Sequence, residues 1–429
     1  MKQYEEYKDS GIQWIGKIPK DWCLLPLKYY ISFAKGRIPK DTTDENVGFP
    51  YLTMDYLRGR KDKQIIYTKD TENLPLMEDN DIIVLWDGAN AGEFMRAKKG
   101  YLGSTMAKVS FNQKKYDGSY FFYLLCSIET ISKEFANGTT IPHFDSKILT
   151  DYSYPCPDIT EQQSIASYLD YKVGQIDIVI SEKEKMLEDL KAYRSAIISE
   201  TITNGLGSDV EMKDSGVQWI GMIPNDWNCL PLKYLLSETL QYGANEPAEY
   251  DNPEWPRYIR ITDIDDSGKL KQETFKSLPP EKAQEYILKK GDVLFARSGA
   301  TVGKTYIFEE DYKACFAGYL IKASCNEKLL PQFLYLYTNS KQYENWKNSV
   351  FTQATIQNIG ADKYSLLPIA IPPSRKQQQI IIDFINKKLI NIDAALDELR
   401  AEVEDLKSYK SSLITEAVTG KIDLRDWEK

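Results

Sequence analysis

The stretch KDSGIQWIGKIPKDWCLLPLKYY (residues 8–30) decides the fold, because it returns as KDSGVQWIGMIPNDWNCLPLKYL (residues 213–235). Seventeen of the 23 positions are identical at a constant offset of 205 residues, which chance does not produce. We call this stretch the tryptophan motif. A repeat of this quality indicates that the chain is built from two related halves.

A second repeat follows each half at an offset of 216 residues. DITEQQSIASYLDYK (158–172) aligns with SRKQQQIIIDFINKK (374–388). Both segments open a helical stretch that no proline interrupts. Each half is therefore a tryptophan motif, a body and a helix, in that order. The boundaries this order predicts are 1–157 for the first body with its motif, 158–207 for a central helical region, 208–373 for the second body with its motif, and 374–429 for a C-terminal helical region.

The two bodies differ far more than their frames, but they share one outline. DIIVLWDGANAGE (81–93) aligns with DVLFARSGATVGK (292–304), each a short apolar run followed by a turn with two glycines. Runs of this length and composition are typical of buried strands. We expect an α+β fold, with two tandem α/β domains that have strand-rich cores. Further strands are expected at 51–57, 64–68, 101–110, 257–264 and 304–308.

The helical regions carry matched apolar seams. In the second, Leu396, Leu399 and Val403 belong to a series with alternating spacings of three and four residues, as in a coiled coil. Each helix is predicted to run for about 27 residues, or roughly 40 Å. Two arrangements bury such seams. The helices pack antiparallel against each other, which a pseudo-twofold chain favours, or each packs on its own body.

Composition narrows the class of protein. The chain is acidic, with 54 basic and 63 acidic residues, and therefore differs from a simple basic DNA-binding domain. Each body is close to neutral, and the acidic excess lies outside them, partly in the first helical region. The six cysteines form no CxxC pair, and the charged first residues do not resemble a signal peptide. We expect a cytoplasmic protein with free thiols and no membrane segment.

Recognisable catalytic motifs are missing. His143 is the sole histidine, so neither a two-histidine metal site nor a serine–histidine pair is possible, and a structural or DNA-facing role is favoured for it. The string GATVGK (299–304) is too short for an ATP-binding phosphate loop. The sequence predicts no catalytic, cofactor or metal site, although carboxylates and lysines alone would suffice for a nuclease.

Taken in this order, the motifs resemble the specificity subunit of type I restriction-modification systems. GDVLFARSGATVGK (291–304) looks like the recurring motif of that family's target-recognition domains, and SSLITEAVTGKIDLRDWEK (411–429) looks like its usual C-terminus. The resemblance covers essentially the whole chain. It implies that each body is a target-recognition domain for one half of a split DNA site and that the antiparallel helices set the spacing.

The resemblance also implies partners. Two methyltransferase subunits would bind the helices and supply S-adenosylmethionine chemistry, and two translocase-nuclease subunits that use ATP and magnesium would join in the restriction enzyme. This chain would itself bind no cofactor and catalyse nothing.

Residues that contact DNA are expected in the loops beside the glycine turns, because lysine and arginine bind phosphates while polar side chains read base edges. The candidates in the first body are Lys35, Arg37, Arg58, Arg60, Asn90, Arg96, Thr139, Thr140 and His143. Those in the second body are Gln241, Asn245, Arg260, Arg297, Ser298, Lys304, Thr352, Gln353 and Gln357. Trp14 and Trp219 are repeated in both halves and are therefore expected to be structural.

Two other functions remain open at this point. A stand-alone DNA-binding protein with two dissimilar heads would bind its site without partners, although the acidic helices weigh against it. A nuclease built on carboxylates and lysines would cut DNA in the presence of a metal, although no spacing indicates such a site.

Overall fold

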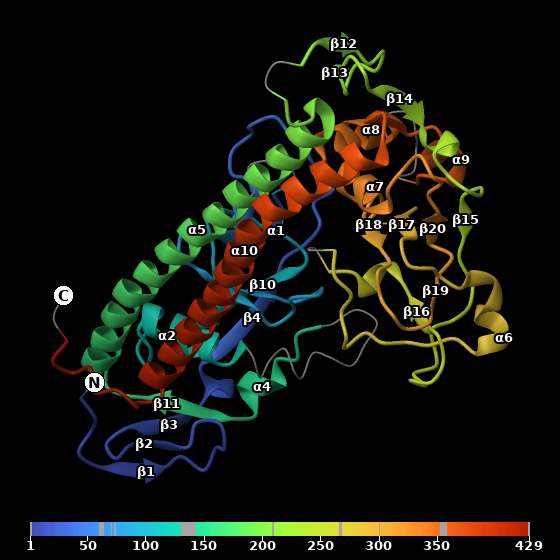
Figure 1. The fold of residues 1–429 in the computed structure, drawn as a ribbon. Helices are drawn as coiled ribbons and strands as arrows, with labels where there is room; N and C mark the ends of the chain where they lie inside the picture. Colours follow the sequence, from blue (N-terminus) through green and yellow to red (C-terminus); the bar gives the residue numbers. More distant parts are fainter. Residues whose placement is uncertain are drawn as a thin grey trace. The chain divides into compact units, whose positions relative to one another are not determined.

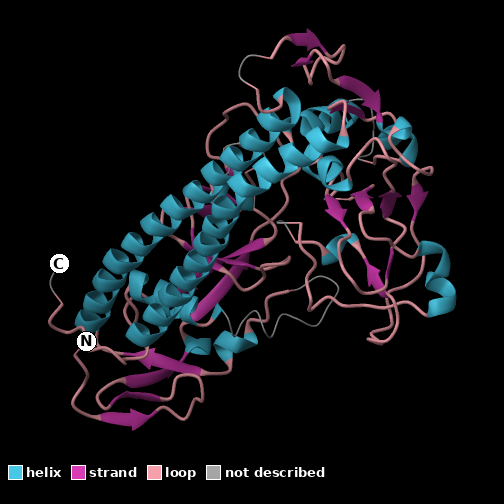
Figure 2. Cartoon of the chain, viewed as in Figure 1, coloured by secondary structure: helices cyan, strands magenta, loops and turns pink. Residues whose placement is uncertain are grey.

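The computed structural model describes residues 2–59, 64–69, 71–72, 74–129, 143–207, 210–265, 268–299, 301–351 and 358–427. It divides into two compact units (Figure 1). Unit 1 comprises Met1–Glu184 and Ala401–Lys429, and unit 2 comprises Lys185–Arg400. The division passes through both long helices, so each unit combines one body with half of each helix (Figure 2).

Unit 1 is built on a four-stranded sheet with the strand order β4-β10-β7-β8. Strand β7 has the sequence IIVL and is buried along its whole length, as its β-branched residues favour. The sheet consists of β4 (Ile31–Lys35), β7 (Ile82–Leu85), β8 (Phe94–Arg96) and β10 (Met106–Phe111). The other strands of the unit are β1 (Tyr7–Asp9), β2 (Lys17–Pro19), β3 (Cys23–Pro26), β5 (Tyr51–Leu52), β6 (Leu76–Met77), β9 (Gly100–Leu102) and β11 (Ser153–Cys156). Its short helices are α1 (Met54–Leu57), α2 (Gly118–Ser127) and α4 (Lys147–Thr150).

Unit 2 repeats this topology with a sheet of order β15-β20-β17-β18. The sheet consists of β15 (Gln241–Tyr242), β17 (Val293–Ala296), β18 (Thr305–Ile307) and β20 (Leu320–Ala323). The other strands are β12 (Met212–Asp214), β13 (Met222–Pro224), β14 (Asn228–Pro231), β16 (Arg257–Ile259), β19 (Ala314–Phe316) and β21 (Pro368–Ile371). The short helices are α6 (Pro280–Ala283), α7 (Pro331–Tyr337), α8 (Lys341–Phe351) and α9 (Ala361–Ser365). The predicted fold, two related α/β halves, is confirmed.

Three of the expected strands are shorter than predicted. After β5, Thr53 caps helix α1 by accepting a hydrogen bond from the Tyr56 amide, which ends the strand. A turn between β9 and β10 divides 101–110, and Arg260 and Asp263 close a 3₁₀ turn directly after β16. The segment 64–68 forms only isolated bridges at Tyr67. Local side-chain caps thus outweigh strand propensity after β5 and after β16.

The long helices are α5 (Ile159–Asn204), with 46 residues, and α10 (Arg375–Val418), with 44. The predicted length of about 27 residues was therefore wrong. Each helix is longer because it has further turns before the seam, such as those with Ile165 and Leu169 in α5, that pack into a body. At 1.5 Å per residue, α5 is about 69 Å long.

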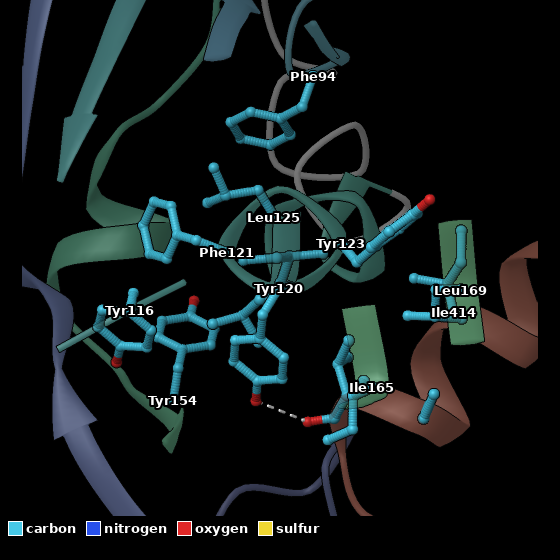
Figure 3. Packing of buried hydrophobic residues seen from close by; sticks show 14 of the residues in the cluster. Phe94, Tyr116, Tyr120, Phe121, Tyr123, Leu125, Tyr154, Ile165, Leu169 and Ile414 are labelled. Carbon is cyan, nitrogen blue, oxygen red and sulfur yellow. Dashed lines mark hydrogen bonds between the residues drawn. The ribbon is translucent and has the colours of Figure 1, made fainter. Parts of the chain in front are cut away.

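Both helices complete the core of unit 1. The first turns of α5 contribute Ile165 and Leu169, and the last turns of α10 contribute Leu413 and Ile414 to the cluster that contains Tyr120 of α2 (Figure 3). All five side chains are at most 5% exposed. The hydroxyl of Tyr120 donates to the Val418 carbonyl at 3.3 Å and to the Pro155 carbonyl at 3.1 Å. The C-terminal helix is thus part of the N-terminal body.

A buried glutamine joins each long helix to its body. The side chain of Gln162 accepts a hydrogen bond from the Asp117 amide at 2.8 Å and donates to the Pro157 and Lys115 carbonyls, both at 2.9 Å. Gln378 likewise accepts from the Leu330 amide at 2.8 Å and donates to the Lys328 carbonyl at 2.7 Å. Asp117 and Leu330 precede α2 and α7, so the two glutamines make the same connection in both halves.

Each long helix ends at a glycine that lies against the tryptophan motif. Gly205 and Gly420 have φ values of +72° and +71°, the left-handed conformation that ends many helices. A Cβ at Gly205 would lie 3.3 Å from Trp227, and one at Gly420 would lie 3.1 Å from Trp22. Both tryptophans are at most 4% exposed, so the motif is a scaffold that packs on a helix end.

The seams of the two helices face each other in antiparallel directions. In unit 1, Lys410 pairs with Asp177 at 2.7 Å, and Lys183 pairs with Glu402 at 2.7 Å. In unit 2, Arg194 pairs with Asp393 at 2.7 Å. Lys183, Arg194 and Lys410 are the charged residues that interrupt the apolar seams, and each is paired with an acid on the opposite helix. Antiparallel packing along the seams and packing of the helix ends on the bodies therefore coexist.

The chain termini meet within unit 1. The Asp423 amide donates to the Lys2 carbonyl at 2.9 Å, and the Lys421 ammonium donates to the Ile15 carbonyl at 2.8 Å. The Arg425 guanidinium lies 5.1 Å from the ring of Tyr4. The last residues thus hold the first tryptophan motif against the end of α10, just as the second motif lies against the end of α5.

Candidate nucleic-acid interface

A matching site lies in each body where the central buried strand ends. Strand β7 leads into Trp86, Asp87 and Gly88, and β17 leads into Arg297, Ser298 and Gly299. Gly88 and Gly299 have φ values of +111° and +82°, which a residue with a Cβ rarely adopts. The glycine turns bring the side chains before them to the surface at the same edge of each sheet.

In the first body, the Asp87 carboxylate contacts two side chains. Its carboxylate accepts from the Lys35 ammonium at 2.8 Å and lies 2.7 Å from Nδ1 of His143. Burial alone would raise the pKa of Asp87, but the hydrogen bonds with Lys35 and His143 outweigh it and lower the pKa. The carboxylate therefore stays ionised near neutral pH. Lys35 and His143 remain about half exposed, so solvent reaches this cluster.

In the second body, Arg297 lies over an aromatic ring. Its guanidinium is 4.9 Å from the centroid of Tyr242, within the range of a cation–π contact. The Tyr242 hydroxyl accepts a hydrogen bond from the Ala361 amide at 2.9 Å, which fixes the ring. Among the described residues, Nε of Arg297 is buried without a hydrogen-bond partner.

The backbone around the two sites is the same. The Trp86 carbonyl accepts from the Phe144 amide at 2.8 Å, and the Arg297 carbonyl accepts from the Ile359 amide at 2.8 Å. Isolated bridges join Asp87 to His143 and Ser298 to Asn358. One frame therefore presents two different sets of side chains.

Several predicted DNA-contacting residues are engaged within their own unit. Arg96 lies 4.6 Å from the ring of Phe122 and 3.3 Å from the Asp170 carboxylate on α5. Arg260 forms a two-pronged pair with Asp263. The remaining engaged candidates are Arg58, which pairs with Glu93 at 2.5 Å, Gln241, which donates to Glu238 at 3.2 Å, and Lys304, which donates to the Ile264 carbonyl at 3.0 Å. Their contacts with DNA stay predictions, and each of these side chains already has a partner within its own unit.

The other candidates fall into three groups. Arg37, Asn90 and Asn245 are exposed, and Lys35, His143, Arg297 and Ser298 belong to the two sites. Six lie outside the described residues: Arg60, Thr139, Thr140, Thr352, Gln353 and Gln357.

Sequence reasoning missed four members of the sites, namely Trp86, Asp87, Tyr242 and Asn358. Trp86 and Asp87 stand in the quoted glycine-turn motif, so aligning the two motifs position by position would have identified them. Tyr242 and Asn358 reach their sites only through pairing across the sheet and the late loop, which the sequence does not show.

Features expected of a catalytic centre are sparse. Among the residues that the structure describes, no group of three or more histidine, cysteine or carboxylate side chains is placed to hold a metal ion. A cavity of about 570 Å³ in unit 2 is lined by charged residues that include Arg194, Lys347 and Asp393. Arg194 pairs with Asp393, and Lys347 pairs with Glu344 at 2.7 Å, so these charges satisfy one another. Within the same part of the chain, every helix is too short or too polar to span a bilayer.

The family model described as the type I restriction modification DNA specificity domain matches the chain twice, over residues 19–188 and 244–405. The chain belongs to this family. The MjaVIII specificity subunit of a type I restriction enzyme from Methanocaldococcus jannaschii is 30% identical, with 96% of this chain and 95% of the relative aligned. The EcoBI specificity subunit of Escherichia coli is 23% identical over 97% of this chain and 90% of its own length. The resemblance noted in the sequence is confirmed.

The fold also has a solved counterpart. A chain from a structure of a type I restriction-modification system, determined to study complex assembly and conformational transition, superposes with a TM-score of 0.56. The match covers 94% of this chain and 99% of that chain at 14% sequence identity, so it supports the fold. The family match makes this chain a DNA-specificity protein with two DNA-recognition domains.

Proposed function

We propose that this chain is the non-catalytic specificity subunit of a type I DNA adenine methyltransferase, which with further subunits becomes a restriction enzyme. Each body reads one half of a split DNA site. The observation that carries this proposal is the duplicated site, in which one backbone frame presents Lys35, Asp87 and His143 in the first body but Arg297 and Ser298 in the second. The backbone is the same in both bodies, but the exposed polar groups differ. This is the arrangement expected of a protein that binds two different half-sites.

The helices supply the spacing and the docking surface. Their antiparallel ion pairs fix the register of α5 against α10 within each unit. Large apolar side chains nevertheless face solvent on both helices, among them Ile178, which is 61% exposed, and Ile390, which is 67% exposed. Apolar residues on an otherwise polar helix surface support a protein interface. We assign this surface to two methyltransferase subunits, which bind S-adenosylmethionine themselves.

The experiment is co-expression with the methyltransferase subunit, followed by methylation-sensitive sequencing of host DNA. The expected result is adenine methylation at a split motif that disappears when this chain is omitted. Absence of both methylation and a co-purifying partner would contradict the proposal and favour a stand-alone DNA-binding protein. ATP-driven translocase-nuclease subunits are tested separately, by restriction of unmethylated phage DNA.

A matched pair of variants tests the docking surface. Ile390→Asp places a charge on an exposed apolar position of α10 and is expected to reduce co-purification of the methyltransferase about tenfold. Asn391→Asp adds the same charge at the neighbouring exposed position and should leave co-purification unchanged. Equal recovery of the partner by both variants would place the interface elsewhere.

A further inference from the structure

The two halves contain the same cation–aromatic pair with its members exchanged. In the first body the ammonium of Lys35 lies 6.0 Å from the ring of Trp86. In the second body the guanidinium of Arg297 lies 4.9 Å from the ring of Tyr242. The cation stands on the outer strand in one half and after the central strand in the other.

The strand register shows that the four positions correspond. Lys35 pairs with Ala107, which also pairs with Val84 two residues before Trp86. In the other half, Tyr242 pairs with Ile321, which also pairs with Phe295 two residues before Arg297. Lys35 therefore corresponds to Tyr242, and Trp86 corresponds to Arg297.

The glycine after each outer strand confirms this register. A Cβ on Gly36 would collide with the carbonyls of residues 102 and 103, and a Cβ on Gly243 would collide with those of residues 316 and 317. The outer strand is thus clamped against the same backbone turn in both halves, and the exchanged pair occupies one place in the frame.

A second pair beside it is not preserved. Asp87 and His143 correspond to Ser298 and Asn358, because each couple is joined by the same isolated bridge. An ionised aspartate only accepts hydrogen bonds, whereas serine and asparagine both donate and accept. The two halves therefore share the charge and the ring at the first place but offer different hydrogen-bonding groups at the second.

On the basis of the proposed function, we propose that the cation–aromatic pair anchors a DNA phosphate in both halves, while residues 87 and 143 and residues 298 and 358 read base edges. A phosphate is the same in every half-site, so its anchor has to preserve positive charge at one place but not the identity of the residue. Base edges differ between half-sites, so the groups that read them have to differ. The ring holds the cation in place, which reduces the conformational freedom lost on binding.

The structure also suggests what the first half reads. Asp87 presents an ionised acceptor with Lys35 and His143 on either side, and a carboxylate of this kind suits the amino group of cytosine. Ser298 and Asn358 carry no charge and suit bases that offer a donor and an acceptor together. The first half-site is therefore expected to contain a cytosine at the position that Asp87 contacts.

The test uses the complex with the methyltransferase and a duplex that carries its methylated motif. Lys35→Gln and Arg297→Gln are each expected to weaken binding about tenfold near 0.1 M salt and to reduce the slope of log K against log salt by about 1. Arg297→Gln should leave the bases of the motif unchanged. Lys35→Gln also removes a partner of the Asp87 carboxylate, so this variant is judged by its affinity and salt slope alone. Arg297→Lys keeps the charge and should preserve both the slope and the motif.

The exchange itself supplies the matched control. Lys35→Tyr alone leaves two aromatic residues and no cation at the site, so it should lose about tenfold in affinity. Adding Trp86→Arg installs the arrangement of the second half and should restore affinity to within about threefold, because the charge returns to the same place. Asp87→Ser combined with His143→Asn should change methylated bases in one half of the motif only.

Three results would overturn the inference while the unmodified complex still methylates a split motif. They are a changed base preference in Arg297→Gln, a double exchange no better than Lys35→Tyr, and an unchanged motif in Asp87→Ser/His143→Asn. Co-purification with the methyltransferase shows that each variant is folded. An unmodified complex that methylates no split motif would instead contradict the proposed function itself.

Discussion

At the scale of single residues, the buried glutamines show how one side chain connects a helix to a domain. Gln162 and Gln378 are fully buried, and each satisfies a backbone amide and at least one backbone carbonyl. These glutamines lie at the start of the predicted helices, but no sequence pattern indicates which groups they bind. Their amide partners, Asp117 and Leu330, lie 45 and 48 residues away along the chain, and only tertiary packing brings them together.

Replacing Gln162 by methionine keeps the volume of the side chain but leaves the Asp117 amide and the Pro157 carbonyl without partners. Buried polar groups left unpaired cost about 1–3 kcal/mol, so we expect the free energy of unfolding to fall by about 2 kcal/mol. Urea denaturation measures the change. Gln163→Met, at the exposed neighbouring position, is the control, and an equal loss in both variants would show that the hydrogen bonds are not responsible.

The hydrogen bonds of Asp423 make the stability of the folded protein depend on pH. Hydrogen bonds from the Arg425 guanidinium lower the pKa of Asp423, whose side chain is only 1% exposed. A carboxyl group whose pKa is lower in the folded protein stabilises it above the pKa of the unfolded chain, about 3.9, and this stability is lost as the pH falls through the folded-state pKa.

Asp423→Asn should therefore lower the unfolding free energy by about 2 kcal/mol at neutral pH, and the difference from the unmodified protein should disappear in strong acid. Thermal melting at a series of pH values checks this. Asp426→Asn removes the same charge from a largely exposed residue and should have little effect at any pH. A difference between Asp423→Asn and the unmodified protein that persists in acid would show that packing, not ionisation, is the cause.

At the scale of elements, the helices were predicted in type and direction but not in length. The antiparallel arrangement follows from two matched seams in a duplicated chain, and the structure confirms it. The predicted length was wrong because the first turns of α5 carry apolar residues for the body, such as Ile165 and Leu169, rather than for the other helix. The spacing of apolar residues in a seam indicates only where the two helices contact each other. Strand lengths were overestimated in the same way, because the apolar pattern does not show where a side-chain cap ends a strand.

The helix ends offer a test of the contact with the tryptophan motif. Gly420→Ala forces a Cβ into Pro19 and strains a backbone with a φ of +71°, so we expect a loss of about 3 kcal/mol or more. Gly11→Ala has a φ of +72° with open space around the new Cβ, and it should lose only about 1 kcal/mol. Equal losses in chemical denaturation would mean that backbone strain alone matters at Gly420.

At the scale of the whole molecule, the duplication was fully visible in the sequence, and so was the family. The candidate site was visible only in part, because the glycine-turn motif contains Arg297 and Ser298, whereas Tyr242 and Asn358 join them through strand pairing. The contact between the termini was not visible at all. It depends on residues 2 and 423 meeting within unit 1.

That contact predicts that the chain tolerates a new order of its segments. A permuted chain that begins at residue 210, joins residue 427 to residue 2 through a short glycine–serine linker and ends at residue 207 keeps every described hydrogen bond of unit 1. It should co-purify with the methyltransferase and direct methylation to the unchanged motif. A permuted protein that is folded but directs methylation elsewhere would show that the order of the segments matters for recognition.

The exchanged cation and ring carry an evolutionary consequence. Two halves that descend from one ancestral segment reached opposite arrangements, and a direct path passes through a form with two cations or a form with two rings. The form with two cations retains a positive charge for the DNA phosphate. It is therefore the intermediate that would still bind DNA. A column-by-column alignment of the halves scores both positions as unrelated, although the contact they make has been inherited intact. Ancestry in such proteins is therefore better traced by pairs of touching residues than by single positions.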